Sequence, residues 1–246
     1  MRKLAFFTRN MKEILRDPLN LCFGLGFPIV LLLLLSIIQA NIPVSLFEIE
    51  ILTPGIAVFG LSFITLFSAT LIAKDRETAL MQRLYTTPMQ AVDFIAGYAL
   101  PMLPLSLAQC MICYAVAAFL GLPITVGILY GVFALIPTAW FFICLGLLCG
   151  SVLNSKQVGG ICGALLTNLT AWLSGVWFDL SLVGGIFQKI AGILPFVHAV
   201  ELERLALQGD LAGCLPHLLW VMGYALAVSV VAVAVFVGQM KHSSCR

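Results

Sequence analysis

The residue types that most often do chemistry in proteins are few in this sequence, and none of them forms a recognisable catalytic or metal-binding pattern. Cys110 and Cys113 form a CxxC pair, but the surrounding segment is apolar and contains neither a second pair nor a nearby histidine, so neither a zinc site nor a redox site is expected. His198, His217 and His242 have no companion residues of a catalytic motif. The phosphate-loop motif GxxxxGK[ST] and the hydrolase motifs GxSxG and HExxH are absent. We therefore expect no catalytic residue, no metal site and no bound cofactor in this chain.

Small polar residues gather within the apolar segment 158–178. Thr167, Thr170 and Ser174 fall at i, i+3 and i+7, so they share one face of a helix, and Asn168 lies beside them. Such a face either lines a transport pathway or packs against another helix, because Ser, Thr and Asn form hydrogen bonds between membrane helices. The sequence leaves both interpretations open. No long apolar segment carries a charged residue near its middle, which argues against a carrier driven by protons or ions.

Charged residues gather instead in two segments outside the apolar runs. Residues 75–83 read as a short helix with its charges on one side, followed by Thr86, Thr87 and Pro88. This helix could dock a soluble partner, or the segment could simply connect two membrane helices. Residues 1–19 form an amphipathic helix, ended by Pro18, that we expect to lie on the inner leaflet. Its apolar face carries Leu4, Phe7, Met11, Ile14 and Leu15, and its charged face carries Arg2, Arg9, Lys12, Glu13 and Arg16.

The composition predicts that these segments are positioned by membrane-spanning helices. The 246 residues are 61% hydrophobic and only 10% charged, with a mean hydropathy of +1.09, and a soluble domain could not hide so much apolar surface from water. Apolar runs of about 20 residues are long enough to cross a bilayer as helices. We find six, at about 20–40, 52–73, 94–120, 126–150, 158–178 and 216–238. The predicted fold is therefore an all-α, polytopic membrane protein with six transmembrane helices.

The segment 179–212, between the fifth and sixth predicted spans, differs from the rest. Its two apolar pieces are too short to cross the membrane and are separated by Pro195. Backbone polar groups at membrane depth must be covered by protein or water. We therefore expect short re-entrant helices that dip into the outer leaflet and pack against the mouth of the bundle.

The positive-inside rule gives the orientation. Eleven of the 13 lysines and arginines lie in the N-terminal segment, the second-to-third connection, the fourth-to-fifth connection and the C-terminus, and only Lys189 and Arg204 lie on the opposite side. We therefore expect both termini in the cytoplasm and the chain in the inner (plasma) membrane. The net charge of +2 gives no indication of nucleic acid binding, because the basic residues are accounted for by topology.

Three local patterns, in order along the chain, carry a resemblance to a known family. The first is Arg16-Asp17-Pro18 before the first span. The second is residues 75–84, closing on Thr87-Pro88. The third is residues 174–178, followed by Pro195 and residues 199–209. Together they resemble the permease subunits of type 2 ATP-binding-cassette transporters, which are mostly exporters, and the resemblance covers nearly the whole of residues 1–246 as a single permease domain. Thr78-Ala79 stands where that family often has Gly-Thr, and Asp179 where a proline often follows.

The resemblance implies partners that the chain itself lacks. A separate ATP-binding subunit would bind ATP and Mg and dock on the coupling loop 74–92, and a second permease copy or paralogue would complete the transporter. The residues implied in coupling are Asp75, Arg76, Glu77, Leu80, Arg83 and Leu84, with Arg9, Lys12, Arg16 and Asp17 of the N-terminal helix. The expected cargo is drug-like, peptide or lipid-like. The alternative is a membrane factor for immunity or assembly that binds a lipid or peptide without transporting it and has no ATPase partner.

Overall fold

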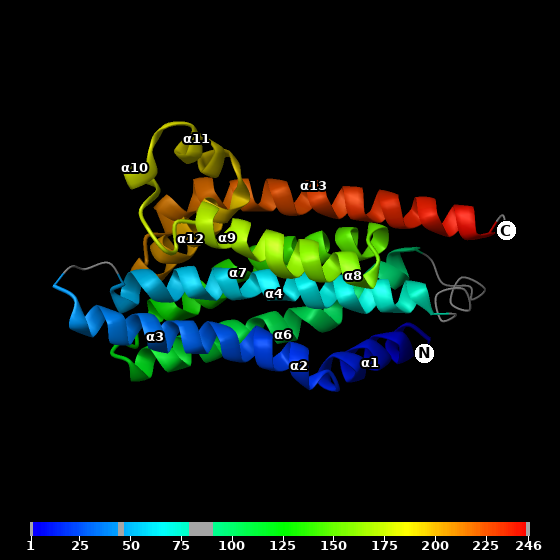
Figure 1. The fold of residues 1–246 in the computed structure, drawn as a ribbon, viewed down its shortest axis with the longest axis horizontal. Coiled ribbons are helices and arrows are strands. Elements are labelled where there is room, and N and C mark those ends of the chain that lie inside the picture. Colours follow the sequence, from blue (N-terminus) through cyan, green and yellow to red (C-terminus); the bar gives the residue numbers. More distant parts are fainter. Residues whose placement is uncertain (1, 44–46, 79–90, 245–246) are drawn as a thin grey trace.

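The computed structural model describes residues 2–43, 47–78 and 91–244, and every regular element in these ranges is a helix. Five helices are long and apolar enough to cross a membrane: Cys22–Asn41, Ile49–Glu77, Val92–Phe119, Val126–Val152 and Leu211–Gln239. They lie side by side along the long axis of the molecule (Figure 1). The prediction of an all-α protein with several membrane-spanning helices is confirmed.

The N-terminal part contains four consecutive helical pieces: α1 (Arg2–Leu15), α2 (Pro18–Leu21), the π-helix η1 (Cys22–Gly26) and α3 (Phe27–Asn41). Pro18 starts α2, because proline lacks the N–H that would be unpaired at a helix start. Gly24 in η1 lies so close to α4 that a Cβ atom would stand 2.3 Å from the Phe67 ring. The chain therefore turns from α1 into the first long helix directly against α4.

The centre of the bundle is formed by α4 (Ile49–Glu77), which packs most extensively against α7 (Val126–Val152). Gly146 and Gly150 of α7 let the two backbones touch, since a Cβ at either position would lie 2.6 Å from the carbonyl oxygen of Thr65 or Ala69. The Thr65 hydroxyl donates to the Phe142 carbonyl at 2.8 Å. α6 (Ala91–Phe119) and α13 (Leu211–Ser244) flank this pair.

The fifth predicted span, 158–178, is not the single regular helix that the apolar run suggested. The structure has α8 (Ser155–Val158), the π-helix η2 (Gly159–Leu166) and α9 (Thr167–Leu173) in immediate succession, and the helical segment ends at Leu173. Glycines at 159, 160 and 163 weaken the regular α-helix here. The Thr167 hydroxyl bonds the carbonyl of Cys162, five residues back, at 3.0 Å, as the wider turn of a π-helix allows.

Three short helices lie at one end of the bundle: α10 (Leu180–Val183), α11 (Gly185–Ile193) and α12 (Pro195–Gln208). Two were expected in this segment. The additional break lies at Gly184, whose positive φ of 61° separates α10 from α11. Pro195 opens α12, and Gly209 ends it in the left-handed conformation. Helix α1 and the C-terminal end of α13 lie at the opposite end of the molecule from these helices (Figure 1).

Candidate functional site

A buried carboxylate at the end of α4 connects three helices. Asp75 is only 4% exposed, and its Oδ1 accepts a hydrogen bond from Arg9 Nη2 of α1 at 2.8 Å. Its Oδ2 accepts from Arg9 Nη1 and from the hydroxyl of Tyr98 of α6 at 2.8 Å. The two-pronged contact between guanidinium and carboxylate is the strongest common form of ion pair in proteins. We call Arg9, Asp75 and Tyr98 the Asp75 cluster.

Helix α1 is held against α6 on the same side. Asn10 is fully buried, donates from Nδ2 to the Gly97 carbonyl at 2.8 Å and accepts from Arg9 Nη1 at 2.8 Å. Phe6 lies edge-on to Tyr98, with ring centroids 5.0 Å apart, and covers Gly97, where a Cβ would stand 2.2 Å from the Phe6 ring. The buried face of α1 is therefore Phe6, Asn10 and Ile14.

The apolar residues expected on one face of the N-terminal helix divide between buried and exposed positions. Ile14 is buried, whereas Leu4 and Leu15 are more than half exposed. Asn10, a polar residue, is buried as well, through its two hydrogen bonds. Contact of Leu4 and Leu15 with the inner leaflet stays a prediction.

The residues next to Asp75 hold α4 to the other side of the bundle. Arg76 donates from Nη1 to the carbonyl oxygens of Gly150 at 2.9 Å and Leu153 at 3.2 Å, which are the unpaired carbonyls at the end of α7. Glu77 accepts from the backbone N–H of Ser155 at 2.8 Å and from its hydroxyl at 2.7 Å. The last turn of α4 is therefore attached to α1 and α6 through Asp75, and to α7 and α8 through Arg76 and Glu77.

The sequence predicted a separate helix over residues 75–83, but the structure assigns the first three of these residues to α4. Asp75, Arg76 and Glu77 are the last three residues of α4, and Thr78 is extended, with ψ of 161°. The helix continues to Glu77 because all three side chains find partners on neighbouring helices. Leu80, Arg83 and Leu84 lie outside the described residues.

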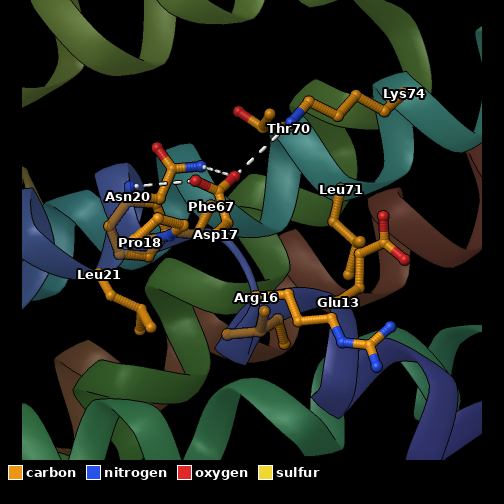
Figure 2. A pocket seen from close by; sticks show the side chains of 11 residues that line it. Glu13, Arg16, Asp17, Pro18, Asn20, Leu21, Phe67, Thr70, Leu71 and Lys74 are labelled. Carbon is orange, nitrogen blue, oxygen red and sulfur yellow. Dashed lines mark hydrogen bonds and ion pairs between the residues drawn. The ribbon is translucent and has the colours of Figure 1, made fainter.

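A cavity of about 470 Å³ lies between α1, α2 and α4, beside the Asp75 cluster. Figure 2 shows Lys74 reaching toward Asp17, which also receives hydrogen bonds from Asn20. The distance from Lys74 Nζ to Asp17 Oδ2 is 3.6 Å, and Asn20 Nδ2 lies 2.8 Å from the same oxygen. Arg16 lines this cavity, and it also borders a second, more open hollow along α1 with Arg9 and Lys12. The predicted charged residues of the N-terminal helix thus lie close to the end of α4.

The polar face of the 158–178 segment points into the bundle. Thr167, Thr170 and Ser174 are buried, while Asn168 is exposed and donates to the Ala164 carbonyl at 2.8 Å. Ser174 donates to the Ala171 carbonyl at 3.3 Å, and the buried Thr170 hydroxyl has no hydrogen-bond partner in the part of the chain that the structure describes. Three of the four residues therefore lie against the interior of this chain, and only Asn168 faces outward.

A second cavity, of about 750 Å³, lies under the short helices at the other end of the bundle. Arg204 of α12 pairs with Glu201 at 2.7 Å and donates to the carbonyls of Ile51 and Gly175 at 3.4 and 3.3 Å. The Nδ1 atoms of His198 and His217 lie 2.9 Å apart. The sequence analysis missed this pair because the two histidines are brought together only by the packing of α12 against α13.

The described titratable side chains at the two ends of the molecule do not form a metal site. In the described ranges, no three His, Cys, Asp or Glu side chains are grouped as a metal site requires. The charged residues at the end of α4 are engaged in structural bonds, so they can transmit a displacement between helices.

Comparison with known proteins agrees with the arrangement of the helices. The family model described as ABC-2 type transporter matches residues 4–207. The match begins in α1 and ends within the last turn of α12, so it includes the Asp75 cluster, the lining of the first cavity and all of the second cavity's lining except His217. No curated protein matches the chain.

Proposed function

We propose that this chain, which belongs to the ABC-2 type transporter family, is the permease subunit of an exporter driven by a separate ATPase subunit. Permeases of this family generally work with a separate ATP-binding subunit. The observation that carries the proposal is the attachment of the last turn of α4 to four neighbouring helices, directly before the segment expected to meet the ATPase.

We infer six membrane crossings. Helix α1 and the C-terminal end of α13 lie at the same end of the bundle (Figure 1), and an odd number of crossings would separate them. The succession of α8, η2 and α9 covers residues 155–173 without interruption and supplies the sixth crossing. The excess of lysine and arginine at the end that carries α1 and the end of α4 favours its placement in the cytoplasm of a cell with an inner (plasma) membrane.

The coupling mechanism follows from the contacts of α4. When the two ATPase subunits close on ATP, they push the loop that follows Thr78. Because Asp75 is bonded to Arg9 and Tyr98, and Arg76 to the end of α7, the push moves α1, α4, α6 and α7 together. Two permeases, identical or paralogous, face each other, and this movement changes the cavity between them from inward to outward access.

The cargo class is inferred from the absence of fixed charge in the long helices. Apart from the charged residues at their ends, the five long helices carry no Asp, Glu, Lys or Arg in the described ranges. A pathway between such helices suits a drug-like, peptide or lipid-like molecule better than a small ion, which would need compensating charge at membrane depth.

The first experiment is purification of the tagged chain from its native host in mild detergent, with mass spectrometry of the co-purifying proteins and an ATPase assay. Recovery of a phosphate-loop ATPase supports the proposal if its binding fails when residues 75–83 are scrambled, in a variant that is still folded in the membrane. Finding no ATPase under conditions that preserve a known complex favours the non-transporting membrane factor instead.

A second experiment tests coupling directly. In the reconstituted complex, Glu77→Ala combined with Arg83→Ala should abolish the stimulation of ATP hydrolysis by the permease while the permease stays folded. Glu50→Ala, an exposed glutamate at the other end of the same helix, is the matched control and should leave coupling intact. Undiminished coupling in the Glu77 and Arg83 variant would show that the docking assignment is wrong.

A further inference from the structure

One fully buried carboxyl group is not used by the coupling mechanism. Glu203 of α12 has no exposed surface. Its Oε1 accepts a hydrogen bond from the Tyr114 hydroxyl of α6, and its Oε2 has no hydrogen-bond partner among the described residues. Gly131 of α7 packs against this pair, since a Cβ there would lie 2.7 Å from Glu203 Oε1 and 2.9 Å from the Tyr114 oxygen. The carboxyl group is therefore enclosed by α6, α7 and its own helix.

The position of the carboxyl group is well inside the bundle. Gly131 lies five residues from the start of α7, and Tyr114 five residues from the end of α6. At a rise of 1.5 Å per residue, both are about 8 Å from the ends of their helices. Glu203, with no exposed surface, is therefore out of contact with solvent while α12 is in this position.

No charge compensates an ionised Glu203. The titratable groups near it are the Tyr114 hydroxyl, the Cys110 thiol and the Cys214 thiol, and none of these is a cation. The neighbouring Arg204 guanidinium is directed to Glu201 and to the carbonyls of Ile51 and Gly175. A buried carboxylate with a single donor pays a large desolvation cost, whereas the neutral acid avoids most of it.

We propose that Glu203 is a proton-binding site whose occupancy holds α12 against the bundle. With its proton bound, the neutral side chain fills the space between α6 and α7 beside Tyr114. When the proton leaves, the carboxylate must be hydrated, and hydration requires α12 to move away from Gly131. This proposal does not depend on the identity of the cargo or on an ATPase partner.

The same helix connects this site to the outer cavity. The face of α12 opposite Glu203 presents His198, Glu201 and Arg204 to the 750 Å³ cavity. Loss of the Glu203 proton therefore changes the shape of that cavity as well as the packing of α12. The protonation state of Glu203 is a means by which the pH outside the cytoplasm could act on the outer end of the protein.

The sign of the pH effect follows from burial. Burial raises the pKa of the Glu203 carboxyl well above its ordinary value, while the unfolded chain has a pKa of about 4.3. The bound proton therefore stabilises the folded protein fully at pH values below the pKa of the unfolded chain. This stabilisation is lost as the pH rises through the raised pKa of the folded protein. The wild-type protein should melt at a progressively lower temperature than Glu203→Gln as the pH increases.

Infrared spectroscopy of the purified full-length chain tests the proton directly. At about pH 7, where an ordinary carboxyl is ionised, the wild type should show the C=O stretching band of a protonated carboxylic acid. The band should persist in Glu201→Gln, which changes a neighbouring glutamate on the outer face of α12, and disappear in Glu203→Gln. If Glu203→Gln does not accumulate, Glu203→Met, apolar and similar in size, serves to assign the band. A missing band in the wild type, or one that survives replacement of Glu203, overturns the proposal.

Thermal unfolding tests the attachment of α12. The difference in melting temperature between Glu203→Gln and the wild type should increase from about pH 5 to about pH 8, and Glu201→Gln should follow the wild type. A difference that does not change with pH would show that Glu203 does not hold a titrating proton in the folded protein.

Discussion

Removing Arg9 should destabilise the protein more than removing any other charge of α1. Arg9→Met keeps the apolar stem of the side chain. Asp75, which is 4% exposed, is then left with the Tyr98 hydroxyl as its one side-chain donor within residues 2–43, 47–78 and 91–244. Breaking a buried ion pair by removing one partner costs about 3–5 kcal/mol. The Arg9 side chain is 33% exposed, so water takes up part of this cost, and we expect the loss to lie near the lower limit, about 3 kcal/mol.

The measurement is thermal unfolding of the purified permease, followed as an apparent midpoint because membrane proteins rarely refold on cooling. A loss of about 3 kcal/mol corresponds to a decrease of roughly 6–12 °C for a chain of this size. Arg16→Met is the matched control, since Arg16 is exposed and makes no ion pair among the described residues. It should shift the midpoint by no more than about 2 °C.

A double-mutant cycle identifies the partner. Asp75→Asn removes the buried charge, so Arg9→Met combined with Asp75→Asn should recover most of the stability lost in Arg9→Met alone. If the two changes are additive, or if Arg9→Met behaves like Arg16→Met, then Arg9 and Asp75 do not form a buried pair in the membrane. That result would also contradict the coupling role proposed for the Asp75 cluster.

Two further predictions concern glycines at close backbone contacts. Gly223→Ala in α13 is the control for both, because no atom of another described segment lies within 4 Å of the added Cβ. Gly97→Ala places a methyl group 2.2 Å from the Phe6 ring and should cost about 1–3 kcal/mol by displacing α1. The additional change Phe6→Leu should restore part of the loss in the same melting assay. Gly127→Ala places its methyl group 1.9 Å from the backbone oxygen of Leu207, which cannot rotate away, so we expect little folded protein in the membrane fraction by fluorescence-detected gel filtration. Normal accumulation of Gly127→Ala would show that α12 does not pack on α7 as described.

The approximate positions of the five long helices could be predicted because a bilayer imposes a simple length requirement on apolar segments. The ends of these helices were harder to predict. The second span was expected at 52–73, but α4 extends to Glu77 because Asp75, Arg76 and Glu77 find partners on other helices. Hydropathy cannot detect such an extension, since it treats each charged residue as the end of an apolar run.

The Asp75 cluster itself depends on tertiary contacts that no local pattern contains. Arg9 and Asp75 are 66 positions apart, and Tyr98 belongs to a third helix. One local signal was present: Asn10 lies four residues from both Phe6 and Ile14, on the face of α1 that the structure buries. A polar residue in line with buried apolar ones needs a hydrogen-bond partner, and the pattern therefore indicated that α1 packs against protein as well as lipid.

Helix packing explains how a displacement at the end of α4 can reach the outer cavity. α4 has 29 residues and is therefore about 43 Å long. At Gly146 and Gly150 its backbone touches that of α7 without an intervening side chain, so the two helices cannot slide past each other by changing rotamers. Relative movement must then occur elsewhere, and the adjacent segment 155–173 contains an eight-residue π-helix, a form that is rare in α-helices and frequent at functional sites. In the proposed mechanism, α4 and α7 would move as one rigid pair, and the glycine-rich helix beside them would accommodate the change in shape.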